Sequence, residues 1–220
     1  RLWWSGVAMG VSLAIKPMLA PLLFLPLVRR QWQPFVASIA IPAVTMAVGW
    51  ALTVDARAYV DKTLPYMGEV RDYYNSSLAG LGVYYGVPDP LVLVSRVLVV
   101  VATLVAAWLL LDYRHNHEVL WLATTSGVIL TGVFLVSSLG QKYYSMMLIP
   151  LLLTVVLSGS LVRNWAAWLA AYACFTLDFW ESLRWPYYGR LLEFAHPTLG
   201  WLLLLATVLV VLLWRRTDPR

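Results

Sequence analysis

The chain has 220 residues, of which 61% are hydrophobic and 12% are charged. Soluble domains usually carry about 25% charged residues, and the mean hydropathy here is +0.73. The formal net charge of +5 comes from basic residues that sit at the ends of apolar runs, which is typical of membrane proteins. The composition therefore excludes a soluble globular domain and predicts an all-α, polytopic transmembrane helical bundle with no nucleic-acid partner.

Apolar runs of about the length that crosses a bilayer recur along the chain. The first run, 3–28, contains Lys16 followed by Pro17, and we expect a broken or re-entrant segment there because proline interrupts helical hydrogen bonding. Six clear spans are predicted after it, at 35–54, 91–111, 119–139, 145–162, 165–179 and 198–214. Together they predict a single transmembrane domain, residues 1–220, with an extracytoplasmic loop at 55–90.

If every span crosses once, the connections fall into two groups. One group carries arginine in each connection and should be cytoplasmic by the positive-inside rule: Arg29, Arg30, Arg114, Arg163, Arg215, Arg216 and Arg220. The opposite group contains 55–90, 140–144 and 181–197. We therefore expect a multi-pass protein of the plasma membrane whose active face is extracytoplasmic.

Isolated cysteine and histidine residues give no metal signature. Cys174 is the single cysteine, which excludes an intrachain disulfide. His115 and His117 have no further ligand nearby in the sequence, so their loop is interpreted as solvated. His196 precedes Pro197 at the outer boundary and is interpreted as an interfacial residue.

Lys16 is the sharpest anomaly, because an ammonium inside the membrane costs on the order of 2.5 to 3.5 kcal/mol on insertion scales. A lipid phosphate is a natural partner, although a re-entrant pair of half-helices would also let the lysine reach an interface. Lys142 also follows an apolar run, but placing its ammonium group costs less free energy than for Lys16, since Lys142 sits at the end of a span. The outer stretches 69–78 and 178–190 combine charges with aromatic rings, which suits a carbohydrate cleft, but interfacial aromatic anchors look the same.

Three motifs resemble one family of membrane enzymes. Ala14-Ile15-Lys16-Pro17 is similar to the Lys-and-Pro segment of the polyprenyl-phosphate-sugar glycosyltransferases of family 87. Asn75-Ser76-Ser77-Leu78 resembles the Asn-Gln-Ser-Leu loop of that family. Ser137-Ser138-Leu139-Gly140-Gln141-Lys142-Tyr143-Tyr144, continuing to Pro150, resembles its segment with paired histidines, where Tyr143 and Tyr144 replace the histidines.

That replacement, with Leu64-Pro65-Tyr66-Met67-Gly68-Glu69, most resembles the branching arabinofuranosyltransferases of the mycobacterial and corynebacterial cell wall. The resemblance implies a GT-C fold that transfers arabinofuranose from decaprenyl-phosphate arabinose to arabinan as an α-1,3 branch, without a cofactor and with little or no metal dependence. Lys16, Lys142 and Arg71 would bind the donor phosphate. Asn75, Ser76, Tyr143 and Tyr144 would position donor or acceptor.

Two other functions stay open at this point: mannosyl transfer from a polyprenyl-phosphate-mannose donor, and a non-enzymatic transporter or lipid flippase, for which a broken helix with a buried lysine is equally natural. The resemblance places the catalytic base in an early outer loop that precedes Arg1, so no base is assigned here. We expect the chain to be the C-terminal part of a larger enzyme and to be inactive in isolation.

Overall fold

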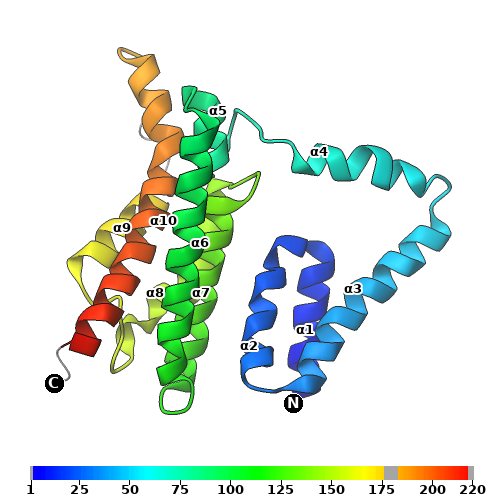
Figure 1. Ribbon diagram of the computed structural model, residues 1–220, viewed down its shortest axis with the longest axis horizontal. Coiled ribbons are helices and arrows are strands. Elements are labelled where there is room, and N and C mark those ends of the chain that lie inside the picture. The colour runs from blue at the N-terminus through cyan, green and yellow to red at the C-terminus, as the bar shows by residue number, and fades with distance from the viewer. Residues whose placement is uncertain (1, 176–182, 218–220) are drawn as a thin grey trace. The chain divides into compact units, whose positions relative to one another are not determined.

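The computed structural model describes residues 2–175 and 183–217, and all regular elements within them are helical (Figure 1). Arg220, the end of the expected span 165–179 and the beginning of the aromatic stretch 178–190 lie outside the described residues. Four helices in the described residues are long and apolar enough to cross a membrane, which confirms the all-α membrane class. The chain divides into two compact units, Arg1–Glu69 and Val70–Arg220, and each is described by itself; the expected single domain stays a prediction.

Unit 1 begins with the broken segment, and the break falls where the sequence predicts it. Helix α1 (Leu2–Ile15) ends before Lys16, whose φ of −133° and ψ of 87° are not helical, and the 3-10 helix η1 (Pro17–Leu23) and α2 (Phe24–Val28) follow. Pro17 has no N–H to continue the hydrogen-bond ladder of α1. The interruption therefore has a local cause.

Helix α3 (Trp32–Leu52) packs along α1 in unit 1. Small residues allow the close approach: a Cβ on Gly6 would lie 2.6 Å from the Cα of Pro34, and one on Gly10 would lie 2.9 Å from the Cβ of Ile41. Close backbone packing through glycine is the usual way in which membrane helices associate. A π-helix (Tyr59–Thr63) and α4 (Leu64–Gly68) complete the unit.

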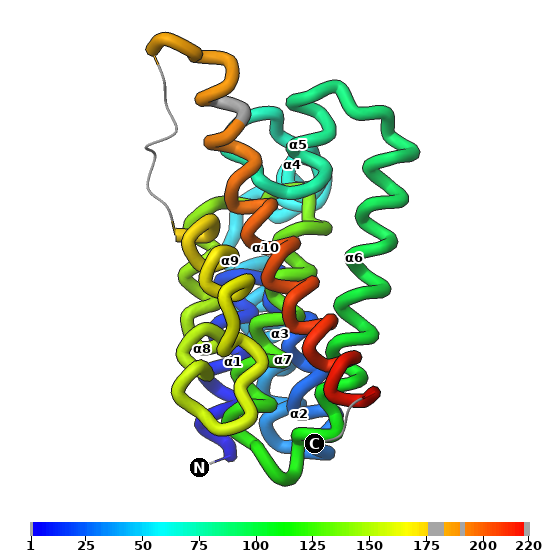
Figure 2. Tube along the Cα trace, turned by 90° about the vertical axis from the view of Figure 1, so that its left-hand side faces the viewer, coloured from blue at the N-terminus to red at the C-terminus, as the bar shows by residue number. Residues whose placement is uncertain are grey.

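Unit 2 is a bundle around α7 (Glu118–Val136), which has buried residues on every face. Helices α6 (Asp89–Leu110) and α10 (Pro186–Thr217) both pack on α7, and α9 (Trp165–Phe175) packs on α10. Figure 2 shows α9 lying beside the middle part of α10. The short α5 (Leu78–Tyr85) adds to one end of the bundle.

The expected span 145–162 is an apolar segment of short helices and not one continuous helix. It consists of η4 (Lys142–Leu148), α8 (Ile149–Leu153) and η5 (Thr154–Val156). Pro150 occupies the first turn of α8, where its ring is tolerated but ends the ladder from η4. The Arg163 guanidinium then donates to the carbonyl oxygens of Val155 at 2.8 Å and Leu157 at 3.0 Å, which satisfies groups that a continuous helix would have paired.

Within unit 2, connections from the two predicted groups lie at opposite ends of the bundle. At one end, Arg216 pairs with Asp112 at 2.7 Å and Arg215 donates to the carbonyl oxygen of Gly159 at 2.7 Å. At the other end, the loop at 71–77 is hydrogen-bonded to the turn at 138–140 and to α10. This arrangement agrees with the predicted alternation of the connections, while the membrane face on which each end lies stays a prediction.

Candidate active site

Asn75 holds together the two loops of unit 2 that the sequence singles out. Its Nδ2 donates to the carbonyl oxygens of Arg71 at 3.0 Å and Ser138 at 2.8 Å. Its Oδ1 accepts from the backbone N–H of Ser77 at 3.1 Å and of Gly140 at 2.9 Å. The side chain is 3% exposed, and all four hydrogen bonds that an amide can readily form are made to backbone.

Further hydrogen bonds fix the same two loops to each other and to α10. The backbone N–H of Ser76 donates to the carbonyl oxygen of Gly140 at 2.7 Å. Thr198 of α10 donates through Oγ1 to the carbonyl oxygen of Ser76 at 2.5 Å, and Trp201 donates through Nε1 to Ser145 Oγ at 3.0 Å. Because these groups are buried, their pairing sets the register of α10 against the loops.

A pocket of about 470 Å³ opens where these elements meet, which is within the usual range for small-molecule sites. It combines aromatic rings, hydroxyl groups, one amide, one lysine and one glutamate. The residues that line it are Tyr74, Ser76, Gln141, Lys142, Tyr143, Ser145, Met146, Cys174, Phe175, Glu193 and Phe194.

Edge-on and tilted aromatic contacts hold the walls of this pocket. The ring of Tyr143 meets that of Tyr144 with centroids 4.8 Å apart, and Tyr144 in turn packs on Phe134 at 5.4 Å. Tyr74, whose φ of 46° is unusual for a residue with a side chain, meets Phe194 at 5.9 Å. The rings therefore stand in a fixed arrangement around the opening.

The structure brings six of the seven predicted site residues into unit 2 but gives them different positions. Ser76, Lys142 and Tyr143 line the pocket. Asn75 and Tyr144 are buried behind its wall. The main chain of Arg71 is held by Asn75, and its positive charge acts electrostatically on the Tyr144 hydroxyl.

Several lining residues were missed by the sequence interpretation. Glu193 and Phe194 belong to a stretch that reads equally well as an interfacial helix, and Ser145 and Cys174 lie in apolar runs. The stretch predicted to combine charges with aromatic rings, 178–190, ends before Glu193, and 181–197 was predicted only to be an outer connection. The local sequence carries no signal for packing between α10 and a loop that precedes it by more than 100 residues.

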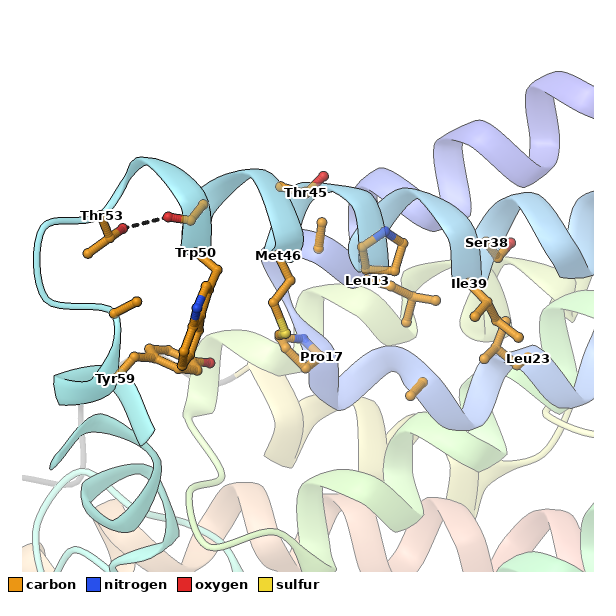
Figure 3. Close-up of a pocket in the computed structure, with 15 residues that line it drawn as sticks. Leu13, Pro17, Leu23, Ser38, Ile39, Thr45, Met46, Trp50, Thr53 and Tyr59 are labelled. Carbon is orange, nitrogen blue, oxygen red and sulfur yellow. Dashed lines mark hydrogen bonds between the residues drawn. The ribbon is translucent and has the colours of Figure 1, made fainter. Parts of the chain in front are cut away.

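Lys16, the seventh predicted residue, lies in unit 1, which has a separate pocket of about 560 Å³ (Figure 3). Its neighbours Ala14 and Pro17 line that pocket, which otherwise runs along α3 past Met46 and Trp50. The lining is predominantly apolar. The helix break therefore places the half-buried Lys16 next in sequence to residues that line an apolar pocket.

The histidines have ordinary protein contacts. Arg114 Nε lies 2.8 Å from His115 Nε2, and the buried His196 has Nδ1 3.0 Å from the carbonyl oxygen of Leu192. Within residues 2–175 and 183–217, no three His, Cys, Asp or Glu side chains are grouped so that they could hold a metal ion. The described residues thus offer no ligand set for a metal.

The chain is similar in sequence to known proteins over most or all of its length. Residues 1–138 match the model of Glycosyltransferase family 87. The chain belongs to this family. Over its whole length it is 46% identical to an alpha-(1->3)-arabinofuranosyltransferase of Mycobacterium tuberculosis (strain H37Rv), covering 51% of that protein. Over 98% and 99% of its length it is 45% and 44% identical to proteins of the same name from Mycolicibacterium smegmatis and Corynebacterium glutamicum, covering 50% and 52% of them.

The chain thus spans about half the length of the curated glycosyltransferases that it matches. The family 87 match ends at residue 138, before most of the residues that line the unit 2 pocket. The similarity to the three arabinofuranosyltransferases continues through the segments of that pocket, because it covers nearly the whole chain. No solved structure matches this chain.

Proposed function

We propose that the complete protein is a membrane glycosyltransferase that moves arabinofuranose from decaprenyl-phosphate arabinofuranose to cell-wall arabinan and makes an α-1,3 branch. One observation carries the proposal: the similarity to three proteins named alpha-(1->3)-arabinofuranosyltransferase covers nearly the whole chain and so includes every segment of the unit 2 pocket. We further propose that this pocket opens on the extracytoplasmic face of the plasma membrane.

In this reaction the oxygen of an acceptor hydroxyl attacks the anomeric carbon of the donor. The bond from that carbon to the phosphate oxygen breaks, and decaprenyl phosphate leaves with the bonding electrons. Lys142, half-buried in the pocket wall, supplies a positive charge for the phosphate, and Arg71, whose charge acts on the Tyr144 hydroxyl, supports it. Cations held in a partly dehydrated site stabilise such a developing charge strongly. The proton of the acceptor hydroxyl goes to a base that we do not assign within this chain.

The remaining predicted residues have two kinds of role in the proposal. Ser76 and Tyr143 contact donor or acceptor in the pocket, where a hydroxyl and a half-exposed aromatic ring are available. Asn75 and Tyr144 act by holding the loops and rings that form the wall. Lys16 is proposed to bind donor phosphate in unit 1, where the apolar pocket beside it suits part of an isoprenoid chain.

The reaction is tested with membranes that contain the complete protein, a synthetic decaprenyl-phosphate arabinofuranose donor and an α-1,5-arabinan oligomer, with the mannose donor in parallel. Branched product from the arabinose donor alone supports the proposal. Product from the mannose donor alone would reassign the protein to mannosyl transfer. Transfer from neither donor, with the protein shown to be inserted, would refute the transferase and favour a transporter or flippase.

The role of Lys142 is tested by Lys142→Ala. Loss of a charge-assisted contact worth about 1.5 to 3 kcal/mol should lower kcat/KM by about 10- to 150-fold, and Lys142→Arg should recover part of it. Lys62→Ala is the matched control, since Lys62 is exposed and lines neither pocket. Equal turnover by Lys142→Ala and the control, at equal membrane insertion, would remove Lys142 from the site.

A further inference from the structure

Glu193 is the one carboxylate among the described residues that line the unit 2 pocket. It is half-buried on α10 and belongs to none of the three family motifs. The pocket also contains Lys142, so one negative and one positive group face a space surrounded by aromatic rings. This combination differs from a simple phosphate site, for which a carboxylate is unfavourable.

Contacts from Phe194 and Thr198, which are four residues apart on one face of α10, hold the helix segment that carries Glu193 in place. The next residue, Phe194, is 9% exposed and packs edge-on against Tyr84 with ring centroids 4.8 Å apart. Thr198, five residues further along α10, is hydrogen-bonded to the backbone of Ser76, which lines the same pocket. A group on a helix that is anchored in this way is well suited to precise recognition.

The chemistry of the surrounding residues indicates the kind of ligand. A carboxylate accepts hydrogen bonds from two neighbouring hydroxyl groups at once, and such charge-assisted bonds are about twice as strong as neutral ones. Ser76 and Gln141 add neutral donors and acceptors, and Tyr143 presents an exposed ring on which the apolar C–H face of a sugar can lie. Hydroxyl-binding groups beside aromatic faces fit a carbohydrate ring.

We propose that Glu193 binds the ring hydroxyl groups of the transferred or accepting sugar and so determines which sugar the pocket takes. The inference rests on the proposed function. It goes beyond it by assigning the hydroxyl-recognising residue, while Lys142 is left to the phosphate. The sugar concerned is either the donor pentose or the terminal residue of the acceptor.

The test uses the complete protein in detergent and begins with binding in the absence of turnover. Binding of the decaprenyl-phosphate arabinofuranose donor and of an α-1,5-arabinan oligomer is measured separately for wild type, Glu193→Ala and Glu193→Gln. Asp89→Asn is the matched control, because Asp89 is an exposed carboxylate of the same unit outside the pocket. We expect Kd for one of the two ligands to rise about tenfold or more in Glu193→Ala, and less in Glu193→Gln, whose amide oxygen is a weaker acceptor. The ligand that is affected identifies the sugar.

A second measurement separates recognition from a structural role or from neutralisation of Lys142. A donor or acceptor that lacks one ring hydroxyl should bind wild type more weakly than the full sugar does, whereas Glu193→Ala should discriminate little between the two. Unchanged Kd for both ligands in the well-folded Glu193→Gln and Glu193→Ala, or full discrimination retained by either, would overturn the inference. Because binding is read without turnover, that failure is distinct from failure of the wild type to transfer arabinose, which would refute the proposed function.

Discussion

Replacement of Asn75 by alanine should separate the two loops that frame the unit 2 pocket. The change removes four hydrogen bonds, two accepted by backbone carbonyls and two donated by backbone N–H groups. Each is worth about 0.5 to 1.5 kcal/mol net, so the loops should lose about 2 to 6 kcal/mol of local stability. Asn75→Asp keeps the acceptor but places a carboxylate oxygen against the carbonyls of Arg71 and Ser138, and it should also be destabilising.

Hydrogen exchange with mass-spectrometric detection reads this loss directly. Peptides that cover Ser76, Ser77 and Gly140 should exchange about 30-fold faster even at the lower limit of 2 kcal/mol. Asn116→Ala is the control, because Asn116 is exposed at the opposite end of unit 2. If Asn75→Ala leaves exchange of both loops as slow as in the control, the network of Asn75 does not hold the site together.

Three further predictions concern substitutions in unit 2. Gly80→Ala should lower the thermal midpoint in detergent by the equivalent of about 1 to 3 kcal/mol, because its Cβ would overlap the side chain of Asn75. Arg216→Ala should shift that midpoint by no more than the equivalent of about 1 kcal/mol, since its 2.7 Å pair with Asp112 is exposed. Burial, with Tyr84 and Tyr187 nearby, raises the pKa of Tyr85 to about 12. The neutral phenol is thus favoured in the folded state, so this stabilisation is present below pH 10 and lost between about pH 10 and 12, and Tyr85→Phe should show a smaller decrease in melting temperature over that range.

Local chemistry explains which features could be predicted from the sequence. The break after α1 follows from Pro17, and the position of α3 follows from an uninterrupted apolar run. The resemblance to family 87 predicts that Asn75 and Lys142 belong to one site, although the sequence itself does not indicate a contact between their loops. The structure shows why those loops meet, because the amide of Asn75 pairs with the backbone of Ser138 and Gly140.

Long-range packing accounts for what the sequence did not reveal. Hydropathy predicts a continuous span at 145–162 because the segment is apolar. It carries no information on the contacts that allow short helices there, which involve Pro150 and the carbonyl groups bound by Arg163. Glu193 reads as an ordinary interfacial charge. The hydrogen bond of Thr198 with Ser76 and the packing of Phe194 on Tyr84 fix the part of α10 that carries Glu193 at the pocket.

The geometry also divides the predicted site residues into framework and contact groups. Asn75 has used its hydrogen-bonding capacity on backbone, whereas Lys142 presents its charge in the pocket wall. If Asn75 acts by placing the segment that carries Lys142, loss of either residue removes much of the same contribution. The double variant Asn75→Ala/Lys142→Ala should then lower kcat/KM by less than the product of the single effects, as expected for coupled residues. Strictly multiplicative effects would show that Asn75 contributes independently of Lys142.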